Sequence, residues 1–462
     1  MKDYDIAIIG AGVIGSSIAY ILSTFSNLKI ALIEMEQSPG VHTSSRNTVV
    51  IHRPFYLNPE KKFIFAKSSQ YSYEMWKELA LKSELPWKEN GTIEVATNEM
   101  DINTIENYRE YSEKNGLKDN EYKILDRNEI SKLEPKVDAP MAFFSKTDTN
   151  VSFGDFTRKL VNLGINSGLI ALFDSKIISL DDLNGELLIL NNGIQKRISA
   201  ELIINVSGGG SLKLAKSVNL AKRYSVLHFR GDYWKLKKDN NLNILHNIYS
   251  VPQHLKYPFL DPHYIVRPDG SNEIGPNAHL VNSPYGYRKD DMNRRQKYND
   301  IFSLPLLPKL KLFTDREFIS MVRKEWKSSA FRGEMIKRIN NFIPEINENM
   351  ITGRGLSGVR HSLIDKNGFV PLIQEAVSSV KIIPRSDQPH PISMEQRVKL
   401  ILVKLLAGES NRMFANILAV FSMLSSIDIS YKTVERLYSN GEIIVTIHNL
   451  HPLILKGKNV KK

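Results

Sequence analysis

The order of apolar and polar residues near the start of the chain predicts a strand, a tight turn, a helix and a second strand. Residues 5–9 form a short β-branched run, and the glycine-rich segment "GAGVIG" follows it directly. In residues 16–23 the apolar side chains recur at helical spacing, and the next apolar run, "KIALIE", ends in Glu34, nineteen residues (34 − 15) after Gly15. This order and spacing match the dinucleotide-binding unit of a Rossmann-type domain.

Each residue of this unit has a physical role in holding a dinucleotide. Gly10 permits the tight turn, Gly12 lets the backbone approach a pyrophosphate, and Gly15 lets the helix pack closely on the strand. The free N–H groups and the positive end of the helix dipole then bind the phosphates. Glu34 can accept hydrogen bonds from a ribose diol and would repel a 2′-phosphate, which argues against NADP. This unit alone leaves FAD and NAD as alternatives.

Further along the chain, strand-like and helix-like patterns alternate in the first and third parts. Residues 226–290 are rich in Tyr, His and Pro and contain short strand-like runs, which indicates a separate antiparallel sheet. We therefore predict an α/β fold in which a Rossmann-type cofactor domain is interrupted by an α+β substrate domain and followed by a helical tail. The predicted segments are the cofactor domain at 1–85, 145–225 and 351–380, the substrate domain at 86–144 and 226–350, and the tail at 381–462.

Composition narrows the class of protein. With 42% hydrophobic and 24% charged residues the chain is typical of a globular protein. It has no cysteine, which excludes disulfides, thiolate metal sites and cysteine nucleophiles and suits a reducing cytoplasm. Residues 6–22 are the one stretch that approaches the length of a membrane span, but glycine and serine interrupt it, so we expect no transmembrane segment.

Charge is concentrated toward the end of the chain. The formal charge is +12, and residues 381–462 hold 12 Lys and Arg against 6 Asp and Glu, a net of +6. A basic tail is typical of nucleic-acid binding or of an anionic membrane surface, although a solvated helical region would carry the same charge. We expect a cytoplasmic protein, with peripheral membrane attachment as the alternative.

Several segments resemble the FAD-dependent oxidoreductases of the D-amino-acid-oxidase superfamily, and most closely its L-2-hydroxyglutarate oxidase/dehydrogenase branch. The segment "VHTSSRNTVVIHRPFY" resembles the family's stretch beneath the flavin, with His42 and His52 at matching positions and Ser44, Asn47 and Thr48 as the implied cofactor-binding residues. The segment "AELIINVSGGGSLKLAK" resembles the strand and glycine turn near the cofactor phosphates, and its turn contains Ser207 and Gly208. The most specific matches are "YPFLDPHYIVRPDGSNEIGPNAHL" and "GRGLSGVRHSL". The resemblance covers roughly residues 3–375.

The resemblance implies FAD as the cofactor and a 2-hydroxy acid as the substrate, with oxygen or a quinone as the electron acceptor. His263 is the candidate base, because a histidine with a pKa near ~6.5 can take a hydroxyl proton at neutral pH. Arg360 is the candidate clamp for the substrate carboxylate. His52, Arg230 and Tyr264 are further candidates for the substrate pocket. An amino- or imino-acid oxidase of the same superfamily is the alternative enzyme.

Two departures from this family pattern bear on the cofactor. Thr48 is followed by Val49, where the family has a glycine against the flavin, and a valine adds bulk at that close approach. The family's closing strand and flavin-facing helix are not found after the segment "NGFVPLIQEAVSS". The hypothesis that follows is an oxidoreductase that lost its last element to a fused sequence and holds FAD weakly. An inactive fusion is the non-enzymatic alternative.

The tail has a pattern of its own. It contains predicted helices near 394–406 and 410–425 and a third, "YKTVERLYS", capped by Ser430. Three short helices in this order are typical of a helix-turn-helix, and "ISYKTVERLYSNGE" resembles the N-terminal part of an insertion-sequence transposase. Binding to nucleic acid is therefore expected only through residues 394–440. The tail shows no acidic triad for strand transfer, so we do not expect transposition.

Overall fold

The computed structural model describes residues 2–253, 257, 261–288 and 300–370. The predicted helices at 394–406 and 410–425, the transposase-like segment and residues 371–380 of the predicted segment 351–380 lie outside these residues. Within the described ranges no helix has both the length and the apolar content that a membrane crossing requires.

The first sheet has six strands, and its parallel part is the predicted Rossmann-type unit. Strands β1, β2 and β8 pair in parallel with one another, and the second half of the long strand β11 adds to β1 in parallel. The first half of β11 pairs with β10 and β10 with β9, both antiparallel. The strands in sheet order are β8 (Ile170–Leu172), β2 (Ile30–Ile33), β1 (Tyr4–Ile9), β11 (Ile194–Asn205), β10 (Glu186–Asn191) and β9 (Ser175–Asp181).

Strand β1 is buried on both faces, which explains its continuous apolar run. Ile6 and Ile8 pack under helices α1 (Val13–Phe25) and α5 (Phe153–Asn166). The alternate residues, including Ile9, point to the other face and pack against side chains of β9 and β10. This arrangement places the end of β1 at the start of α1, as the sequence pattern predicted.

The second sheet has eight strands and joins two separate parts of the chain. Its pairs are antiparallel except for β14 with β4. Helices α2 (Phe63–Ser83), α3 (Glu99–Lys114) and α4 (Arg127–Leu133) belong to this part of the chain. The strands in sheet order are β18 (Ile351–Arg354), β13 (Trp234–Leu236), β16 (Asn272–Gly275), β15 (His263–Val266), β14 (Asn247–Ser250), β4 (Thr92–Val95), β6 (Met141–Ser145) and β5 (Tyr122–Asp126).

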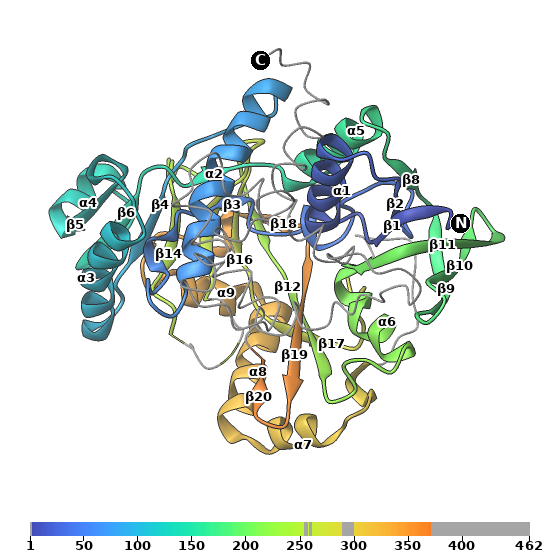
Figure 1. The fold of residues 1–462 in the computed structure, drawn as a ribbon. Coiled ribbons are helices and arrows are strands. Elements are labelled where there is room, and N and C mark those ends of the chain that lie inside the picture. Colours follow the sequence, from blue (N-terminus) through green and yellow to red (C-terminus); the bar gives the residue numbers. More distant parts are fainter. Residues whose placement is uncertain (1, 254–256, 258–260, 289–299, 371–462) are drawn as a thin grey trace, which may run out of the picture.

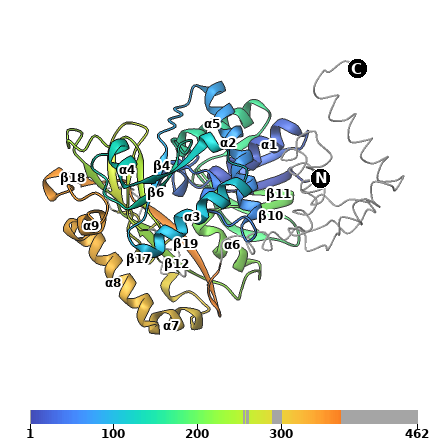
Figure 2. The ribbon, with the colours of Figure 1, turned by 90° about the vertical axis from the view of Figure 1, so that its left-hand side faces the viewer.

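A four-stranded antiparallel sheet lies between these two larger sheets in both side views (Figures 1 and 2). Its central strands are paired along their whole length, from Ser225 opposite Ile364 to Gly231 opposite Gly358. In order they are β17 (His279–Val281), β12 (Ser225–Gly231), β19 (Gly358–Asp365) and β20 (Gly368–Phe369). A fourth, two-stranded sheet pairs β3 (Val50–Ile51) with β7 (Thr149–Asn150).

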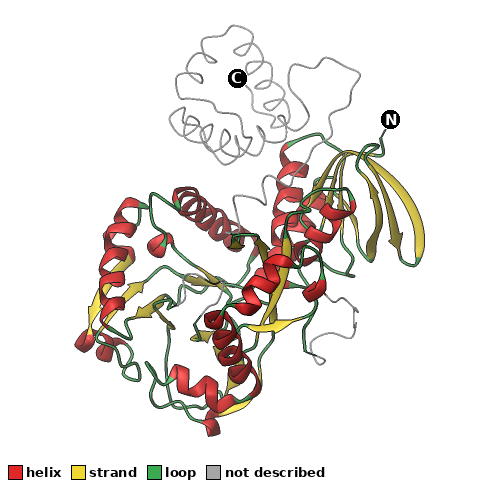
Figure 3. Cartoon of the chain, turned by 90° about the horizontal axis from the view of Figure 1, so that it is seen from below, coloured by secondary structure: helices red, strands yellow, loops and turns green. Residues whose placement is uncertain are grey.

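Helices border the strands in the view from below (Figure 3). Helices α7 (Leu307–Thr314) and α8 (Arg316–Ala330) follow one another near the lower end of β19 (Figure 1). Helix α9 (Arg332–Ile339) comes next and packs Met335 and Ile336 into the core of the eight-stranded sheet. Phe318 and Met321 of α8 pack with Phe229 of β12 in one apolar cluster.

The α/β fold with a Rossmann-type sheet and a separate antiparallel sheet is thus confirmed. The predicted domain limits stay a prediction. The strand pairing of one predicted segment differs from the domain to which it was assigned. The described part of 351–380 was expected with the cofactor domain, but β18 pairs with β13 and β19 with β12. Backbone hydrogen bonds therefore join this segment to the eight-stranded and the four-stranded sheets.

Candidate functional site

The glycine corner between β1 and α1 has no room for side chains. Gly10 has a φ of +106°, and a Cβ there would lie 2.6 Å from the carbonyl oxygen of Val206. A Cβ on Gly15 would lie 1.9 Å from the carbonyl oxygen of Gly10, and one on Gly12 would lie 3.2 Å from Ser44 Oγ. Only glycine fits at Gly10 and Gly15, so the backbone of the corner packs directly against Val206 and the start of α1 lies close to the end of β1.

Two polar side chains stand at this corner. The buried Glu34 carboxylate accepts hydrogen bonds from the backbone N–H of Ala11 at 2.8 Å and of Glu36 at 3.0 Å, and burial raises its pKa. Ser44 Oγ accepts from the backbone N–H of Val13, in the first turn of α1, at 2.9 Å. The acidic residue is therefore fixed beside the corner, and a hydroxyl lies at the positive end of the helix.

The predicted second cofactor segment lies against the first. Ser207 follows Val206 directly, and its hydroxyl donates to Asn205 Oδ1 at 2.7 Å. Gly208 has a φ of +56° and begins a 3-10 turn, Gly208–Gly210, that leads into α6 (Ser211–Ser217). We call the group that these contacts assemble the cofactor end; it consists of Gly10, Gly12, Gly15, Glu34, Ser44, Ser207 and Gly208.

The segment from Ser44 onward leads from this corner toward the second sheet. Asn47 Nδ2 donates to the Ser44 carbonyl at 3.2 Å, and Asn47 Oδ1 accepts from the N–H of Val49 at 2.9 Å. Arg267, from the end of β15, donates to the Asn47 carbonyl at 2.9 Å. Val49 has a φ of +62°, a left-handed conformation that is a genuine outlier for a β-branched residue. The backbone at this position therefore has a conformation that glycine adopts without strain.

His52 is held by a buried carboxylate. Its Nδ1 lies 2.6 Å from Oδ2 of Asp148, which also accepts from the Arg53 N–H and the Ser145 hydroxyl at Oδ1. Because an ionised carboxylate only accepts, Nδ1 of His52 carries a hydrogen. The His52 ring meets the Tyr249 ring edge-on at 5.3 Å.

The Tyr249 ring also contacts His263, so the structure brings the two histidines together. The rings of Tyr249 and His263 stack with centroids 4.1 Å apart and planes 19° apart. Thr48 lies beside the Tyr249 hydroxyl, and burial raises the pKa of that hydroxyl well above its usual value. We call His52, Asp148, Tyr249 and His263 the substrate end.

The imidazole of His263 is completely buried, and burial lowers its pKa to about 3. Its Nδ1 lies 3.1 Å from the carbonyl oxygen of Asp261, and its Nε2 has no hydrogen-bond partner among the described residues. A carbonyl oxygen can only accept, so Nδ1 carries the hydrogen and Nε2 presents a lone pair. The expected pKa near ~6.5 was wrong for the folded chain, since desolvation disfavours the charged ring.

Two of the other predicted pocket residues do not join this group. Tyr264 follows His263 in β15 and therefore points to the opposite face, where it is buried in the core with Trp234 and Ile274. Arg230 pairs with Asp232 at 3.0 Å. This placement corrects the prediction that Tyr264 is a pocket residue. The ion pair of Arg230 does not support the prediction that Arg230 is a pocket residue.

Arg360 and Arg230 lie on opposite faces of the paired strands β12 and β19. Arg360 is opposite Phe229, whereas Arg230 is opposite Val359, and directly opposed residues share a face. Burial lowers the pKa of Arg360. The two arginines therefore do not form a joint clamp, and Arg360 alone stays the candidate for the substrate carboxylate.

Sequence reasoning missed a chain of polar side chains behind the cofactor end. His228 Nε2 lies 2.9 Å from Oδ2 of Asp300, and His228 Nδ1 lies 3.0 Å from Nδ1 of His361. A Cβ on Gly209 would lie 2.6 Å from the His361 ring, so this chain reaches the turn that contains Ser207 and Gly208. The residues are 72 and 133 positions apart, and no local pattern links them.

The residues present fit a flavin dinucleotide. The corner offers a glycine-lined approach, a helix start, a hydroxyl and a carboxylate. Beside it, the rings of His42 and Tyr287 stack at 5.7 Å, and His42 Nδ1 is buried without a hydrogen-bond partner among the described residues. Buried polar atoms are normally bonded, so His42 Nδ1 and His263 Nε2 are what a bound polar molecule would satisfy. No group of three potential metal ligands occurs in the ranges that the structure describes.

Fold and site together define a dinucleotide-binding oxidoreductase of the α/β class. The model of the DAO family, described as FAD dependent oxidoreductase, matches residues 5–384, and the chain belongs to this family. FAD is therefore its cofactor, which confirms that prediction.

Individual proteins agree with this assignment. The chain is 27% identical over 379 residues to the mitochondrial L-2-hydroxyglutarate dehydrogenase of Caenorhabditis briggsae, covering 80% of this chain and 83% of that protein. It is likewise 27% identical over 380 residues to the human mitochondrial L-2-hydroxyglutarate dehydrogenase, covering 79% of each. Among solved structures, L-alpha-glycerophosphate oxidase from Mycoplasma pneumoniae with FAD bound superimposes with a TM-score of 0.57 at 22% identity, covering 79% of this chain and 84% of that chain. This likeness supports the fold.

Proposed function

We propose that the chain oxidises a 2-hydroxy acid, with L-2-hydroxyglutarate as the favoured substrate and 2-oxoglutarate as the product. The names of the curated relatives support this substrate. The observation that carries the chemistry is the buried lone pair on His263 Nε2. The cytoplasm stays the proposed compartment, on the absence of cysteine.

Oxidation of the alcohol removes two electrons and two protons from the substrate. When bound by the cofactor end, FAD would supply the acceptor for the hydride that leaves C2. The remaining proton leaves from the hydroxyl, and we assign Nε2 of His263 as the group that accepts it. The Asp261 carbonyl fixes the tautomer, and the stacked Tyr249 ring fixes the plane of the imidazole.

Other side chains hold the site in position for this step. Asp148 orients His52 at 2.6 Å, and both rings pack against Tyr249, so His52 can contact the bound substrate or support Tyr249. Because His263 is neutral in the folded chain, the substrate hydroxyl meets a hydrogen-bond acceptor rather than an imidazolium.

The test is an absorbance spectrum of the purified chain, reconstituted with FAD and kept without oxygen, before and after addition of one candidate substrate. We expect L-2-hydroxyglutarate to bleach the flavin, and D-2-hydroxyglutarate, glycine and proline to leave it oxidised. Bleaching by glycine or proline instead would support the amino- or imino-acid oxidase. A chain that binds no FAD would contradict catalysis and support the inactive fusion.

The electron acceptor can be identified in the same sample. Rapid recovery of the oxidised spectrum on admitting air indicates an oxidase. Recovery that requires a soluble quinone analogue indicates a dehydrogenase, the activity in the names of the curated relatives.

A further inference from the structure

The segment that leads into α7 exposes a group of large apolar side chains. Phe302 is 70% exposed, Leu304 71%, Leu307 74% and Leu310 59%, although all four lie within nine residues. Single exposed apolar residues are ordinary, but a contiguous group marks a site of interaction.

The backbone of this segment is tied down, so the apolar side chains are held outward. The ammonium group of Lys309 is buried and donates to Ser303, at 3.1 Å to its carbonyl and 2.9 Å to its hydroxyl, and also to the carbonyl of Asp300. From the other side, Lys216 of α6 donates to the carbonyl of Leu304. Polar groups therefore point inward and leucines outward, the reverse of an ordinary surface turn.

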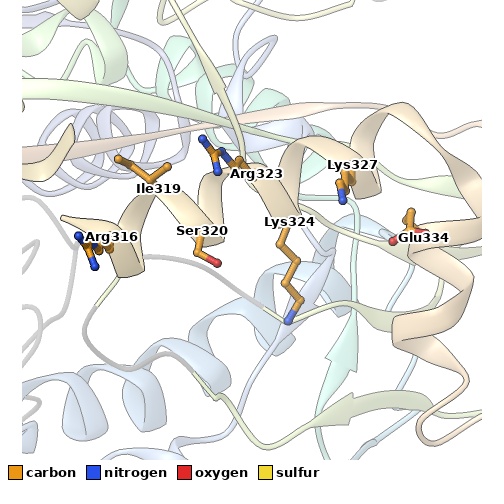
Figure 4. Close-up of a pocket in the computed structure, with 7 residues that line it drawn as sticks. All are labelled: Arg316, Ile319, Ser320, Arg323, Lys324, Lys327 and Glu334. Carbon is orange, nitrogen blue, oxygen red and sulfur yellow. The ribbon is translucent and has the colours of Figure 1, made fainter. Parts of the chain in front are cut away.

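The adjoining helix α8 carries a basic stripe on its outer face. Phe318 and Met321 are buried on its inner face. Arg316, Arg323 and Lys327, at spacings of seven and four residues, are exposed on the opposite side. They line a groove of about 590 Å³, and every lining residue comes from α8 except Glu334 of α9 (Figure 4); the full lining is Arg316, Ile319, Ser320, Arg323, Lys324, Lys327 and Glu334.

The stripe keeps an excess of positive charge, because Glu334 is the one acid among the residues that line the groove, although Lys337 and, less strongly, Lys327 are close enough to lower its pKa. Glu334 pairs with Lys337 at 2.6 Å, and the buried Glu325 pairs with Arg338 at 2.9 Å. Within the described ranges no ion pair joins Arg316, Arg323, Lys324 or Lys327 to a carboxylate. We call the exposed apolar residues and this basic stripe together the α7–α8 surface.

We propose that the α7–α8 surface docks the protein on an anionic lipid bilayer. The leucines and phenylalanine enter the boundary between headgroups and acyl chains, and the arginines and lysines contact the headgroups. Trp326, 50% exposed, and Phe331, 57% exposed, lie at the far end of α8 and extend the contact as interfacial aromatic residues. A second copy of the chain fits less well, because a symmetric contact would set basic stripe against basic stripe.

The orientation that follows brings the strand pair of β12 and β19 close to the membrane. Phe318 on the inner face of α8 packs with Phe229 of β12, which lies opposite Arg360 of β19. A single helix layer therefore separates the docked surface from the strand pair that holds the candidate carboxylate clamp.

The chain contains no cysteine, so one introduced cysteine gives a single labelling site. An environment-sensitive fluorophore is attached to Leu307→Cys or, as the control, to Leu183→Cys, which is 79% exposed in the turn between β9 and β10. Each full-length holoprotein is mixed with vesicles of phosphatidylcholine alone or with 30% phosphatidylglycerol added (about one lipid in three). We expect a blue shift only for the Leu307 label and only with the anionic vesicles.

A second experiment distinguishes binding through the α7–α8 surface from binding through the basic tail, which carries its own net charge of +6 (12 − 6). The double variant Arg323→Gln/Lys327→Gln should bind anionic vesicles at least about tenfold more weakly in low salt. The matched double variant Lys82→Gln/Lys114→Gln, on α2 and α3, should bind as the unaltered chain does. No blue shift at Leu307, or an equal shift at Leu183, would overturn the proposal. If the Arg323→Gln/Lys327→Gln variant binds vesicles as the unaltered chain does, the proposal is overturned in favour of binding through the basic tail. If the chain binds no vesicles, the proposal is overturned in favour of an acidic protein partner.

Discussion

The cofactor end and the substrate end of this molecule are built in different ways. Most of the cofactor end comes from one short stretch of sequence, and its polar groups are already bonded within the chain, as with Glu34 and the N–H of Ala11. The substrate end is assembled from β15, β14 and two segments far from them, and it leaves the Nε2 atom of His263 buried without a partner in the described ranges. The polar groups of the cofactor end are thus already satisfied within the chain, whereas the substrate end leaves a hydrogen-bond acceptor for the substrate.

The largest effect should come from breaking the cofactor end. Gly15→Ala puts a methyl group 1.9 Å from the Gly10 carbonyl oxygen, so either the helix or the corner must move. We expect loss of FAD retention and a fall in stability of about 3 kcal/mol. The measurement is flavin content after gel filtration together with the melting temperature. Gly353→Ala, where a Cβ would meet nothing within 4 Å, should keep both unchanged.

A smaller effect is expected from His263→Asn, which leaves the cofactor end intact. Removing the acceptor of the hydroxyl proton should lower the rate of flavin reduction by about 10²–10⁴ while FAD content stays the same. Rapid-mixing absorbance without oxygen measures this rate. Tyr264→Phe, the next residue in the strand, faces the core and should reduce flavin at the unaltered rate. If both variants lose activity equally, the assignment of faces in β15 is contradicted.

A buried carboxylate behind the substrate end gives a pH test. Glu94 accepts from Tyr108 at 2.8 Å, and burial raises its pKa to about 7. An acid with a raised folded pKa destabilises the fold progressively as the pH rises from about 4.5 to 7, because the unfolded chain releases its proton first. Glu94→Gln should therefore be more stable than the unaltered chain at pH 8, by about 2 kcal/mol, and equal to it at pH 4.5.

Urea unfolding at the two pH values measures this difference. Glu106→Gln, on the exposed side of α3, should show the same difference from the unaltered chain at both pH values. A Glu94→Gln variant that is less stable than the unaltered chain at pH 8 would contradict a raised pKa of Glu94.

The smallest expected effect is on stability, at Val49 between the cofactor end and the substrate end. Val49 has a φ of +62° and packs against Val50, Ile265 and Tyr249. Val49→Gly and Val49→Ala both remove that packing, but only glycine adopts this conformation without strain. The glycine variant should therefore be more stable than the alanine variant, by about 1 kcal/mol in urea unfolding. The reverse order would show that Val49 is not strained.

The difference between the cofactor end and the substrate end also explains which features could be predicted from the sequence. Gly10, Gly15 and Glu34 act through turn geometry and helix position, which depend on neighbours in the chain, and the strand–turn–helix–strand unit was confirmed. The substrate end depends on which face of a strand a residue occupies, and this separated His263 from Tyr264. It also depends on partners far away, since Asp148 lies 96 residues from His52. The pKa of His263 followed from burial, which no short motif reveals.

The most direct test of the proposed chemistry is a single turnover without oxygen. The FAD-loaded chain is mixed with an excess of L-2-hydroxyglutarate, and both the bleaching of the flavin and the amount of 2-oxoglutarate formed are measured. The account predicts one 2-oxoglutarate for each flavin reduced in the unaltered chain, and neither product nor bleaching on the same timescale in His263→Asn. A reduced flavin without 2-oxoglutarate, or a His263→Asn chain as fast as the unaltered one, would contradict it.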